Sequence, residues 1–216
     1  MDGQKRIRRH QHHGQKQSKL RQRKHCDEQP NADDIHLVYV GTVAETGDRQ
    51  YPVQMGRCGD PINPSIHDYY AISKVFSEFA VFESGLKHWV SIRQTGQYPT
   101  NEGAGEEPII FHQPPNNVLE WSASIESGIC MANICESWVP ENFWRKAYNL
   151  SSGKGWRVTC WEFTNLMMKG MGMSFADTQD PRRMAQYNFH GHYFSDADAL
   201  NDILHFRCID PKTYQQ

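Results

Sequence analysis

The sequence has no apolar run that approaches the roughly 18 residues of a membrane-spanning helix, so we expect no transmembrane helix. Its first residues also lack an apolar core, so we expect no secretory signal. Six cysteines are scattered along the chain, and none forms a Cys-x-x-Cys pair. We interpret them as reduced thiols of a cytoplasmic protein.

Charge is distributed unevenly along the chain. Residues 1–30 carry nine Lys/Arg and three Asp/Glu, a net charge of +6, with hardly an apolar side chain. We predict that this tail is disordered, because it cannot bury enough apolar surface to offset its ordering entropy. A basic tail can tether a protein to nucleic acid, or it can be a plain unstructured extension. The other residues carry a net charge of −8, which makes nucleic-acid binding by the body unlikely on electrostatic grounds.

The first half of the body has the pattern of one βαβ unit. Ile35–Val40 is an apolar run typical of a buried parallel strand. Residues 45–67 are rich in Gly, Pro, Asp and Asn and predict a long loop. Asp68 can cap a helix that runs to about residue 84, and Trp89–Arg93 follows as the next strand. Strand, helix and strand in this order predict parallel pairing with a right-handed crossover.

The second half has a mixed pattern, which predicts a smaller α+β lobe beside an α/β sheet. Cys130 and Cys135 are expected to be buried packing residues of a helix. The predicted elements are a strand near Ile109–Phe111, a helix over Val118–Ser137, a short helix from Pro140, a strand at Tyr148–Leu150, a helix opened by the capping box Thr159-x-x-Glu162 and ending near Lys169, and a last helix near Leu200–Phe206.

Tyr70 and Lys74 form a Tyr-x-x-x-Lys pair, which places both side chains on one face of the predicted helix. A cation held beside a phenol favours the phenolate, which lets a tyrosine exchange protons near neutral pH. The alternative is a tyrosine without chemistry beside a lysine that extends along the surface. Thr42 lies at the carboxyl end of the preceding strand, where open α/β sheets bind their ligands.

These residues resemble the extended short-chain dehydrogenase/reductase family of the NAD-dependent epimerase/dehydratase type. The resemblance covers roughly residues 35–206 and rests on Leu37–Gly47, Asp68–Lys74, Trp89–Tyr98 and Tyr148–Leu150 with the glycine that follows them. It implies a partial Rossmann-like parallel sheet with a smaller α+β substrate lobe. It also implies hydride transfer between NAD or NADP and a hydroxyl/carbonyl substrate, with a nucleotide sugar as one candidate.

The resemblance assigns a role to each of these site residues. Tyr70 would exchange a proton with the substrate oxygen, and Thr42 would donate a hydrogen bond to the same oxygen. Lys74 would hold the nicotinamide ribose and lower the pKa of Tyr70. Expected cofactor contacts are Tyr70, Lys74, Gln94, Thr95 and Gly96.

The glycine-rich fingerprint that normally opens this family, G-x-x-G-x-x-G, is missing from the sequence. The Gly-x-Gly pairs that begin at residues 103, 153 and 170 lack its spacing, and residues 1–34 are too short and polar to supply the missing strands. We therefore expect a truncated relative, with weak or no NAD(P) binding by this chain alone. A homo-oligomer or a complementing chain could complete it, and a non-catalytic binding protein that keeps the substrate lobe is the alternative.

The expected division is a tail over residues 1–30, a partial Rossmann-like segment with the catalytic motif over 31–98, and a substrate-binding lobe over 99–216. His190-Gly191-His192 has no compact third and fourth ligand nearby in the sequence, so we predict no metal site. Asp180-Pro181-Arg182-Arg183 could bind an anionic group or form a solvated turn.

Overall fold

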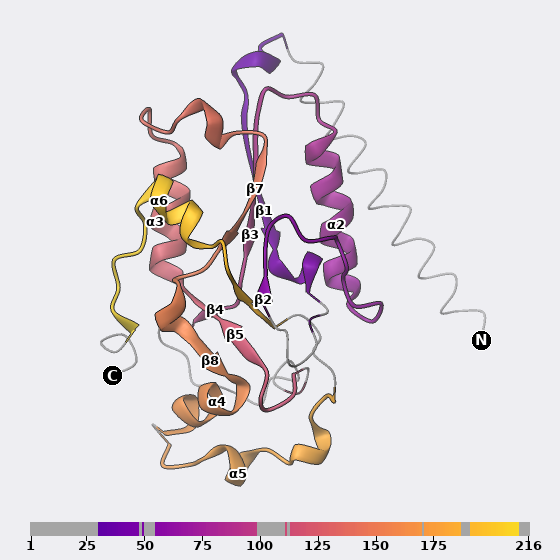
Figure 1. Ribbon diagram of the computed structural model, residues 1–216, viewed down its shortest axis with the longest axis vertical. Coiled ribbons are helices and arrows are strands. Elements are labelled where there is room, and N and C mark those ends of the chain that lie inside the picture. Colours follow the sequence, from indigo (N-terminus) through magenta and orange to yellow (C-terminus); the bar gives the residue numbers. More distant parts are fainter. Residues whose placement is uncertain are drawn as a thin grey trace, which may run out of the picture.

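The computed structural model describes residues 30–47, 49, 55–98, 111, 113–169, 171–186 and 191–211. Its upper part in Figure 1 is a sheet between helices, and its lower part is a small lobe of short strands and helices. The predicted tail lies outside the described residues, apart from its last residue. The strand expected near Ile109–Phe111 also lies outside them, apart from Phe111.

Three parallel strands form the main sheet, in the order β1 (His36–Thr42), β3 (His88–Gln94) and β7 (Lys146–Leu150). The register pairs Thr42 with Gln94 and Gln94 with Leu150, so the three strands end at one edge. The predicted βαβ unit is confirmed, and so is the α/β class with a parallel sheet. Because β7 pairs with β3, the sheet contains residues from both sides of the expected boundary at residue 98.

Helix α2 (Tyr69–Phe82) connects β1 to β3 and packs on one face of the sheet (Figure 1). Asp68 caps it, since its Oδ1 accepts the Ala71 N–H at 2.8 Å. The helix ends two residues before the predicted end, and Gly85 follows with a φ of 76°, which a glycine adopts without strain.

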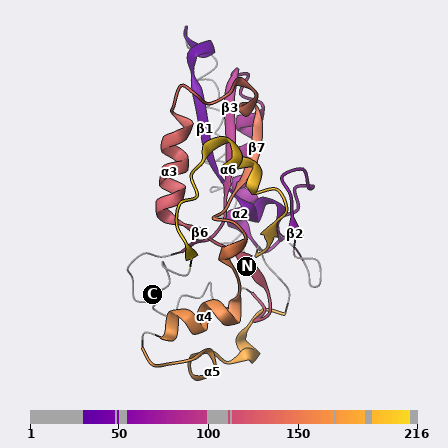
Figure 2. The ribbon, with the colours of Figure 1, turned by 60° about the vertical axis from the view of Figure 1, so that its left-hand side comes forward.

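The main apolar core lies on the other face of the sheet, under α3 (Ser124–Ile134) and α6 (Asp198–Leu204). Figure 2 shows these two helices and the sheet from another side. Strand β3 alternates between the two faces, because Val90 and Ile92 join this core while Ser91 and Arg93 point towards α2. The buried residues of the core are Val90, Ile92, Cys130, Ile134, Phe143, Trp144, Tyr148, Leu150, Leu200, Leu204 and Phe206.

The lower lobe is built from paired short strands and two helices. Strand β4 (Gln97–Tyr98) pairs with β6 (Ser122–Ala123), β5 (Val118–Glu120) pairs with β8 (Arg157–Thr159), and β2 (Met55–Gly56) pairs with β9 (Tyr193–Phe194). Helices α4 (Cys160–Lys169) and α5 (Phe175–Thr178) lie at the bottom of Figure 1. Tyr98, Ala123 and Trp156 form the buried centre of this lobe. The predicted capping box of α4 is confirmed, since Thr159 N–H donates to Glu162 Oε2 at 2.7 Å and Glu162 N–H donates to Thr159 Oγ1 at 3.1 Å.

The helix predicted over Val118–Ser137 is wrong in its first third. Residues 118–123 form β5 and β6, and the helix starts only at Ser124. The reason is pairing with distant partners, because β5 lies against β8 and β6 lies against β4. Local periodicity does not contain this information.

Three smaller expectations also need correction. Strand β1 is parallel, but it pairs only with β3 among the described strands, and Val40 is 41% exposed rather than buried. Cys130 is buried as predicted, whereas Cys135 at the end of α3 is exposed. The short helix after Pro140 is a 3-10 turn over Glu141–Phe143.

Replacement of Ile92 by alanine tests the central core. Ile92 is fully buried in the middle strand, so Ile92→Ala is expected to lower the free energy of unfolding by about 2–5 kcal/mol through lost burial and a residual cavity. The matched control is Ile125→Ala on α3, where the side chain is 52% exposed and the expected loss is within about 0.5–1 kcal/mol. Urea unfolding followed by circular dichroism measures both, and equal losses would contradict this description of the core.

Candidate active site

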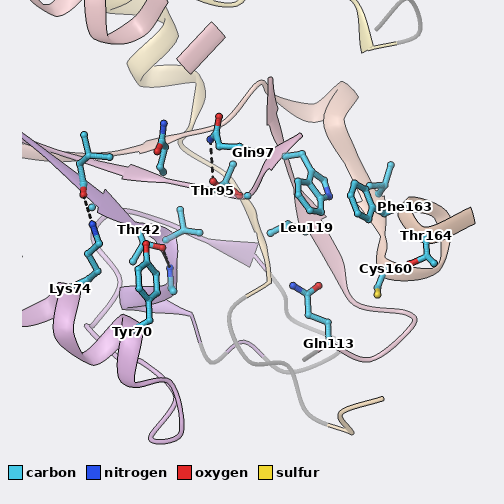
Figure 3. A pocket seen from close by; sticks show the side chains of 18 residues that line it. Thr42, Tyr70, Lys74, Thr95, Gln97, Gln113, Leu119, Cys160, Phe163 and Thr164 are labelled. Atoms are coloured by element: carbon cyan, nitrogen blue, oxygen red, sulfur yellow. Dashed lines mark hydrogen bonds between the residues drawn. The ribbon is translucent and has the colours of Figure 1, made fainter. Parts of the chain in front are cut away.

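A cavity of about 730 Å³ lies at the carboxyl ends of β1 and β3. All six predicted site residues line it: Thr42, Tyr70, Lys74, Gln94, Thr95 and Gly96. Figure 3 labels Thr42, Tyr70, Lys74 and Thr95 among the lining side chains. They come from three segments of the chain that the βαβ unit brings together. The strand register explains this, because parallel strands that end level present their last residues at one edge.

Thr42 ends β1 and begins a 3-10 turn, Val43–Thr46. We call residues 42–46 the Thr42 turn. The Thr42 Oγ1 accepts the Ala44 N–H at 3.3 Å, and the Thr42 N–H donates to Glu45 Oε1 at 3.2 Å, which is a capping box. The hydroxyl therefore acts as a helix cap, yet a hydroxyl that accepts one hydrogen bond keeps its own proton to donate to a ligand.

Tyr70 and Lys74 lie in the first half of α2, and the Tyr70 side chain is 56% exposed. The Lys74 Nζ is 5.8 Å from the centre of the Tyr70 ring and 5.5 Å from that of Tyr39. It donates a hydrogen bond to the carbonyl of Val40 on β1 at 2.9 Å (Figure 3). The ammonium thus lies beside the phenol ring, as the four-residue spacing predicts, while it donates a hydrogen bond to the strand.

The three predicted cofactor contacts at the end of β3 all line the cavity, and two of them, Thr95 and Gly96, also hold the loop that follows the strand. Thr95 is buried, and its hydroxyl donates to the Glu120 carbonyl at 2.6 Å. A side chain on Gly96 would come within 2.9 Å of the Trp121 ring, so glycine allows this close approach. Gln94 directly follows Arg93 and lines the cavity at the end of the strand. Of these three predicted cofactor contacts, Gln94 therefore has the side chain best suited to reach a ligand.

The far end of the cavity is mostly apolar, and sequence reasoning missed it. Trp121 and Phe163 stack there with ring centres 4.1 Å apart and planes 11° from parallel. The missed lining residues come from β5, β8 and α4 and from the segments beside them: Gln113, Leu119, Trp121, Val158, Cys160, Phe163 and Thr164. Their aromatic content was the available signal, but the pairing of β5 with β8, which brings their segments together, is not encoded in any local pattern. The cavity has a polar end at the sheet and an apolar end in the lobe.

No model of a known protein family matches the sequence, and no curated protein matches it. Solved structures do resemble the fold. A dTDP-glucose 4,6-dehydratase from Bacillus anthracis, solved with NAD, aligns with a TM-score of 0.59 at 16% identity and covers 84% of this chain. A UDP-glucuronic acid 4-epimerase from Bacillus cereus, solved with UDP-glucuronic acid and NAD, aligns with a TM-score of 0.59 at 11% identity over 78% of this chain. The dTDP-glucose 4,6-dehydratase DesIV from Streptomyces venezuelae gives a TM-score of 0.61 at 17% identity over 82% of this chain.

Over the aligned residues, this chain shares the Rossmann-like fold of these neighbours. The likeness confirms the predicted Rossmann-like architecture. The chain spans 58%, 55% and 56% of the length of these three neighbours, a little over half. At these identities the likeness extends to the fold, and the roles of individual residues stay predictions.

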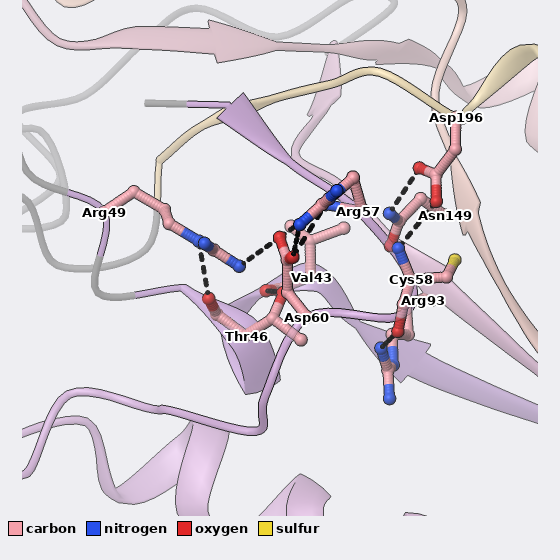
Figure 4. Close-up of polar contacts among 9 residues, drawn as sticks. All are labelled: Val43, Thr46, Arg49, Arg57, Cys58, Asp60, Arg93, Asn149 and Asp196. Atoms are coloured by element: carbon pink, nitrogen blue, oxygen red, sulfur yellow. Dashed lines mark hydrogen bonds and ion pairs between the residues drawn. The ribbon is translucent and has the colours of Figure 1, made fainter. Parts of the chain in front are cut away.

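In this fold, a buried ion pair joins α2 to the sheet, next to residues that line the cavity. Arg93 donates from Nε and Nη2 to the two carboxylate oxygens of Glu78 at 2.9 and 2.8 Å. Its Nη1 donates to the Cys58 carbonyl at 3.1 Å (Figure 4). The Cys58 N–H in turn donates to Asp196, which also accepts from the Asn149 amide at 3.1 Å. The segment after β2 is therefore fixed to β3, β7 and the C-terminal part of the chain.

The structure gives no support to ligand binding at the other candidate sites from the sequence, as far as its described residues reach. Asp180 and Arg182 form an exposed ion pair at 2.8 Å within a turn, which fits the solvated alternative. His190 lies outside the described residues. Among those described, no three His, Cys, Asp or Glu side chains gather as a metal site would require. None of the described helices is long and apolar enough to cross a membrane.

Removal of Arg93 tests the buried ion pair. Arg93→Met leaves Glu78 buried without its cation, so we expect a loss of about 3–5 kcal/mol in the free energy of unfolding. The double variant Arg93→Met with Glu78→Gln should recover part of this loss, because it leaves no uncompensated charge between them. Lys87→Met is the control, since Lys87 pairs with Asp33 on the surface, where such a pair contributes below about 1 kcal/mol. Chemical denaturation measures all three, and a double variant no more stable than Arg93→Met would contradict the argument.

Proposed function

We propose that this chain carries the catalytic part of an NAD(P)-dependent oxidoreductase of the epimerase/dehydratase type. Its substrate would be a small molecule with a reacting hydroxyl or carbonyl group, and nucleotide sugars are the first candidates because the neighbouring enzymes act on them by name. One observation supports this most strongly. The six residues that the sequence singled out come from three separate segments between Thr42 and Gly96, and all of them line one cavity at the carboxyl edge of the sheet.

The chain's own residues divide the work as follows. The Thr42 O–H donates a hydrogen bond to the reacting oxygen of the substrate and stabilises negative charge that develops there. The Tyr70 phenol exchanges a proton with the same oxygen, and its exposure leaves it accessible from the cavity. The Lys74 ammonium has three protons, of which one is bonded to the Val40 carbonyl, so it can also bind a ribose hydroxyl. NAD or NADP, when bound, would accept or return the hydride.

The residues present suit only one end of such a cofactor. Tyr70, Lys74 and Gln94 can hold the nicotinamide ribose and ring. The sequence contains no glycine-rich turn for the pyrophosphate, and the chain covers a little over half of each neighbour's length. We therefore propose that this chain alone binds NAD or NADP weakly or not at all.

Completion by a second chain is part of the proposal. Strand β1 pairs with β3 on one side only within the described part of the chain, and its other edge offers backbone groups to a further strand. That further strand could come from a complementing chain or from a second copy in a homo-oligomer. The protein would act in the cytoplasm, without membrane or nucleic-acid partners. The five described cysteines are all free thiols, which suits a reducing compartment.

Exchange of Tyr70 for phenylalanine tests the catalytic assignment. Tyr70→Phe removes the phenol proton, so turnover of any substrate found should fall by about 10²–10⁴-fold. The fold should be unaffected because the side chain is more than half exposed. The matched control is Tyr69→Phe at the neighbouring position, where the side chain is 64% exposed and turnover should be unchanged. Equal activity of Tyr70→Phe and wild type would refute the role of Tyr70.

Calorimetric titration with NAD(H) and NADP(H), together with light scattering, tests whether the chain is complete. A folded monomer is expected to bind neither cofactor in the micromolar range, because the pyrophosphate contacts are missing. Micromolar binding by a monomer would contradict the incomplete site. Micromolar binding by a larger assembly would support completion by a second copy. No binding by any assembly, with no activity, would favour the non-catalytic alternative.

A further inference from the structure

Three charged side chains are buried together between α2 and the sheet, and two of them directly adjoin in sequence residues that line the cavity. Glu45, Glu78 and Arg93 are exposed by 0%, 1% and 3%. Each belongs to an element that carries part of the candidate site: the Thr42 turn, the helix of Tyr70 and Lys74, and the strand that ends at Gln94. Whatever holds these three side chains together also holds the three parts of the site together.

The cluster contains two carboxyl groups but one cation. Arg93 forms its two short hydrogen bonds with Glu78, whereas its Nε is 4.0 Å from Glu45 Oε2. The other oxygen of Glu45, Oε1, accepts the Thr42 N–H at 3.2 Å. Among the described residues no donor lies within hydrogen-bonding distance of Glu45 Oε2, although this atom is buried. A second full negative charge here would be buried without a partner of its own, which is costly.

A proton on Glu45 Oε2 removes the second buried negative charge and gives this oxygen a hydrogen bond to donate. Glu45 and Glu78 both lie against the Arg93 guanidinium, at 4.0 Å and 2.8 Å, and two neighbouring carboxyl groups can share a hydrogen bond only when one is protonated. Burial, and then the neighbouring Glu78, raise the pKa of Glu45 to about 8. Burial acts on Glu78 in the same direction, but the hydrogen bonds from Arg93 outweigh it and hold the pKa of Glu78 below its ordinary value. The proton therefore stays on Glu45.

We propose that Glu45 is a positioning residue of the candidate site, which holds the Thr42 backbone in place as a neutral acid hydrogen-bonded to the Glu78 carboxylate. One oxygen of Glu45 accepts the Thr42 N–H, and the other donates its proton to the Glu78–Arg93 pair. Loss of this proton leaves two negatively charged carboxylates, Glu45 and Glu78, which repel each other next to Thr42. The Thr42 turn is therefore ordered at neutral pH and loosens as the pH rises through about 8.

The neighbouring groups whose pKa is shifted, Tyr39, Cys58 and Arg93, keep their protonation state over the same pH range. Burial, followed by the charge of Glu45, raises the pKa of Tyr39 on β1 above its ordinary value. Burial, followed by Asp196, raises the pKa of the Cys58 thiol to about 12. Arg93 stays charged. At the far end of the Thr42 turn, Arg49 donates to the Thr46 carbonyl at 3.0 Å and pairs with Asp60 at 2.7 Å, which fixes that end independently (Figure 4).

The Thr42 backbone amide reports directly on this arrangement. Its resonance in a two-dimensional ¹⁵N–¹H spectrum of the full chain should shift between pH 6 and 9.5 with a midpoint near 8. In Glu45→Gln the shift should be absent, since the amide group can accept from Thr42 and donate to Glu78 without titrating. Glu78→Gln should lower the midpoint, because Glu45 then becomes the carboxylate that pairs with Arg93. Glu136→Gln, an exposed site on the surface, should behave like wild type.

Stability against pH gives a second readout with a defined sign. The folded state keeps a proton on Glu45 that the unfolded chain releases near pH 4.5, so wild type loses stability as the pH rises from about 5 to 8 and then levels off. The unfolding equilibrium constant of wild type relative to Glu45→Gln should rise by up to about tenfold per pH unit across that range. A Thr42 resonance that does not titrate in wild type, or a stability difference independent of pH, would overturn the proposal.

This inference rests on the proposed function only in treating Thr42 as a residue that contacts the ligand. Neither measurement needs cofactor or substrate, so the two can fail separately. If the Thr42 amide resonance shifts with pH while Tyr70→Phe is fully active, Glu45 remains the positioning residue and the catalytic role of Tyr70 is wrong. If the Thr42 resonance does not shift with pH while Tyr70→Phe is inactive, the role of Tyr70 stands and the role of Glu45 is wrong.

Discussion

The parallel pairing of β1 with β3 places Thr42 level with Gln94, and the rest of the candidate site is positioned from these two strand ends. The crossover helix α2 must then start near the same edge, which puts Tyr70 and Lys74 at the mouth of the cavity. Side chains on a strand alternate between its faces, so a slip of one residue would exchange the core-facing Ile92 with the helix-facing Arg93. The apolar core and the buried ion pair thus both oppose any change of register.

The two faces of the sheet are held by different forces. Under α3 and α6 the contacts are apolar and largely fully buried, which stabilises without strict geometry. Under α2 the sheet carries Ser91 and Arg93, which bind Glu78 through three hydrogen bonds of 2.6 to 2.9 Å. Directional bonds of this kind fix orientation more than they add stability. The polar face is the one that carries the candidate catalytic residues, so the directional hydrogen bonds fix the orientation of the elements that position these residues.

The sequence predicted what depends on local pattern and missed what depends on distant contacts. The apolar run before Thr42, the cap at Asp68 and the Tyr-x-x-x-Lys spacing are local signals, and the βαβ unit they predict is confirmed. The strands at residues 118–123 and the apolar end of the cavity arise from pairing across about 25 and about 40 residues, which no local period encodes. Glu45 lies between these cases. Thr42-Val43-Ala44-Glu45 has the same Thr-x-x-Glu pattern as the predicted capping box at Thr159, so the cap could be found from sequence, whereas the contact of Glu45 with Glu78 could not.

Lys74 links the completeness of the sheet to the chemistry of the site. An edge strand leaves backbone carbonyls without a strand partner, and the Lys74 ammonium supplies a donor to one of them at Val40. A strand added at this edge would bring its own N–H groups and could replace the lysine there. The ammonium would then have all three protons available for Tyr70 and a ribose. A partner that extends the sheet would in this way add more than its own binding residues, because it would also change what Lys74 binds within this chain.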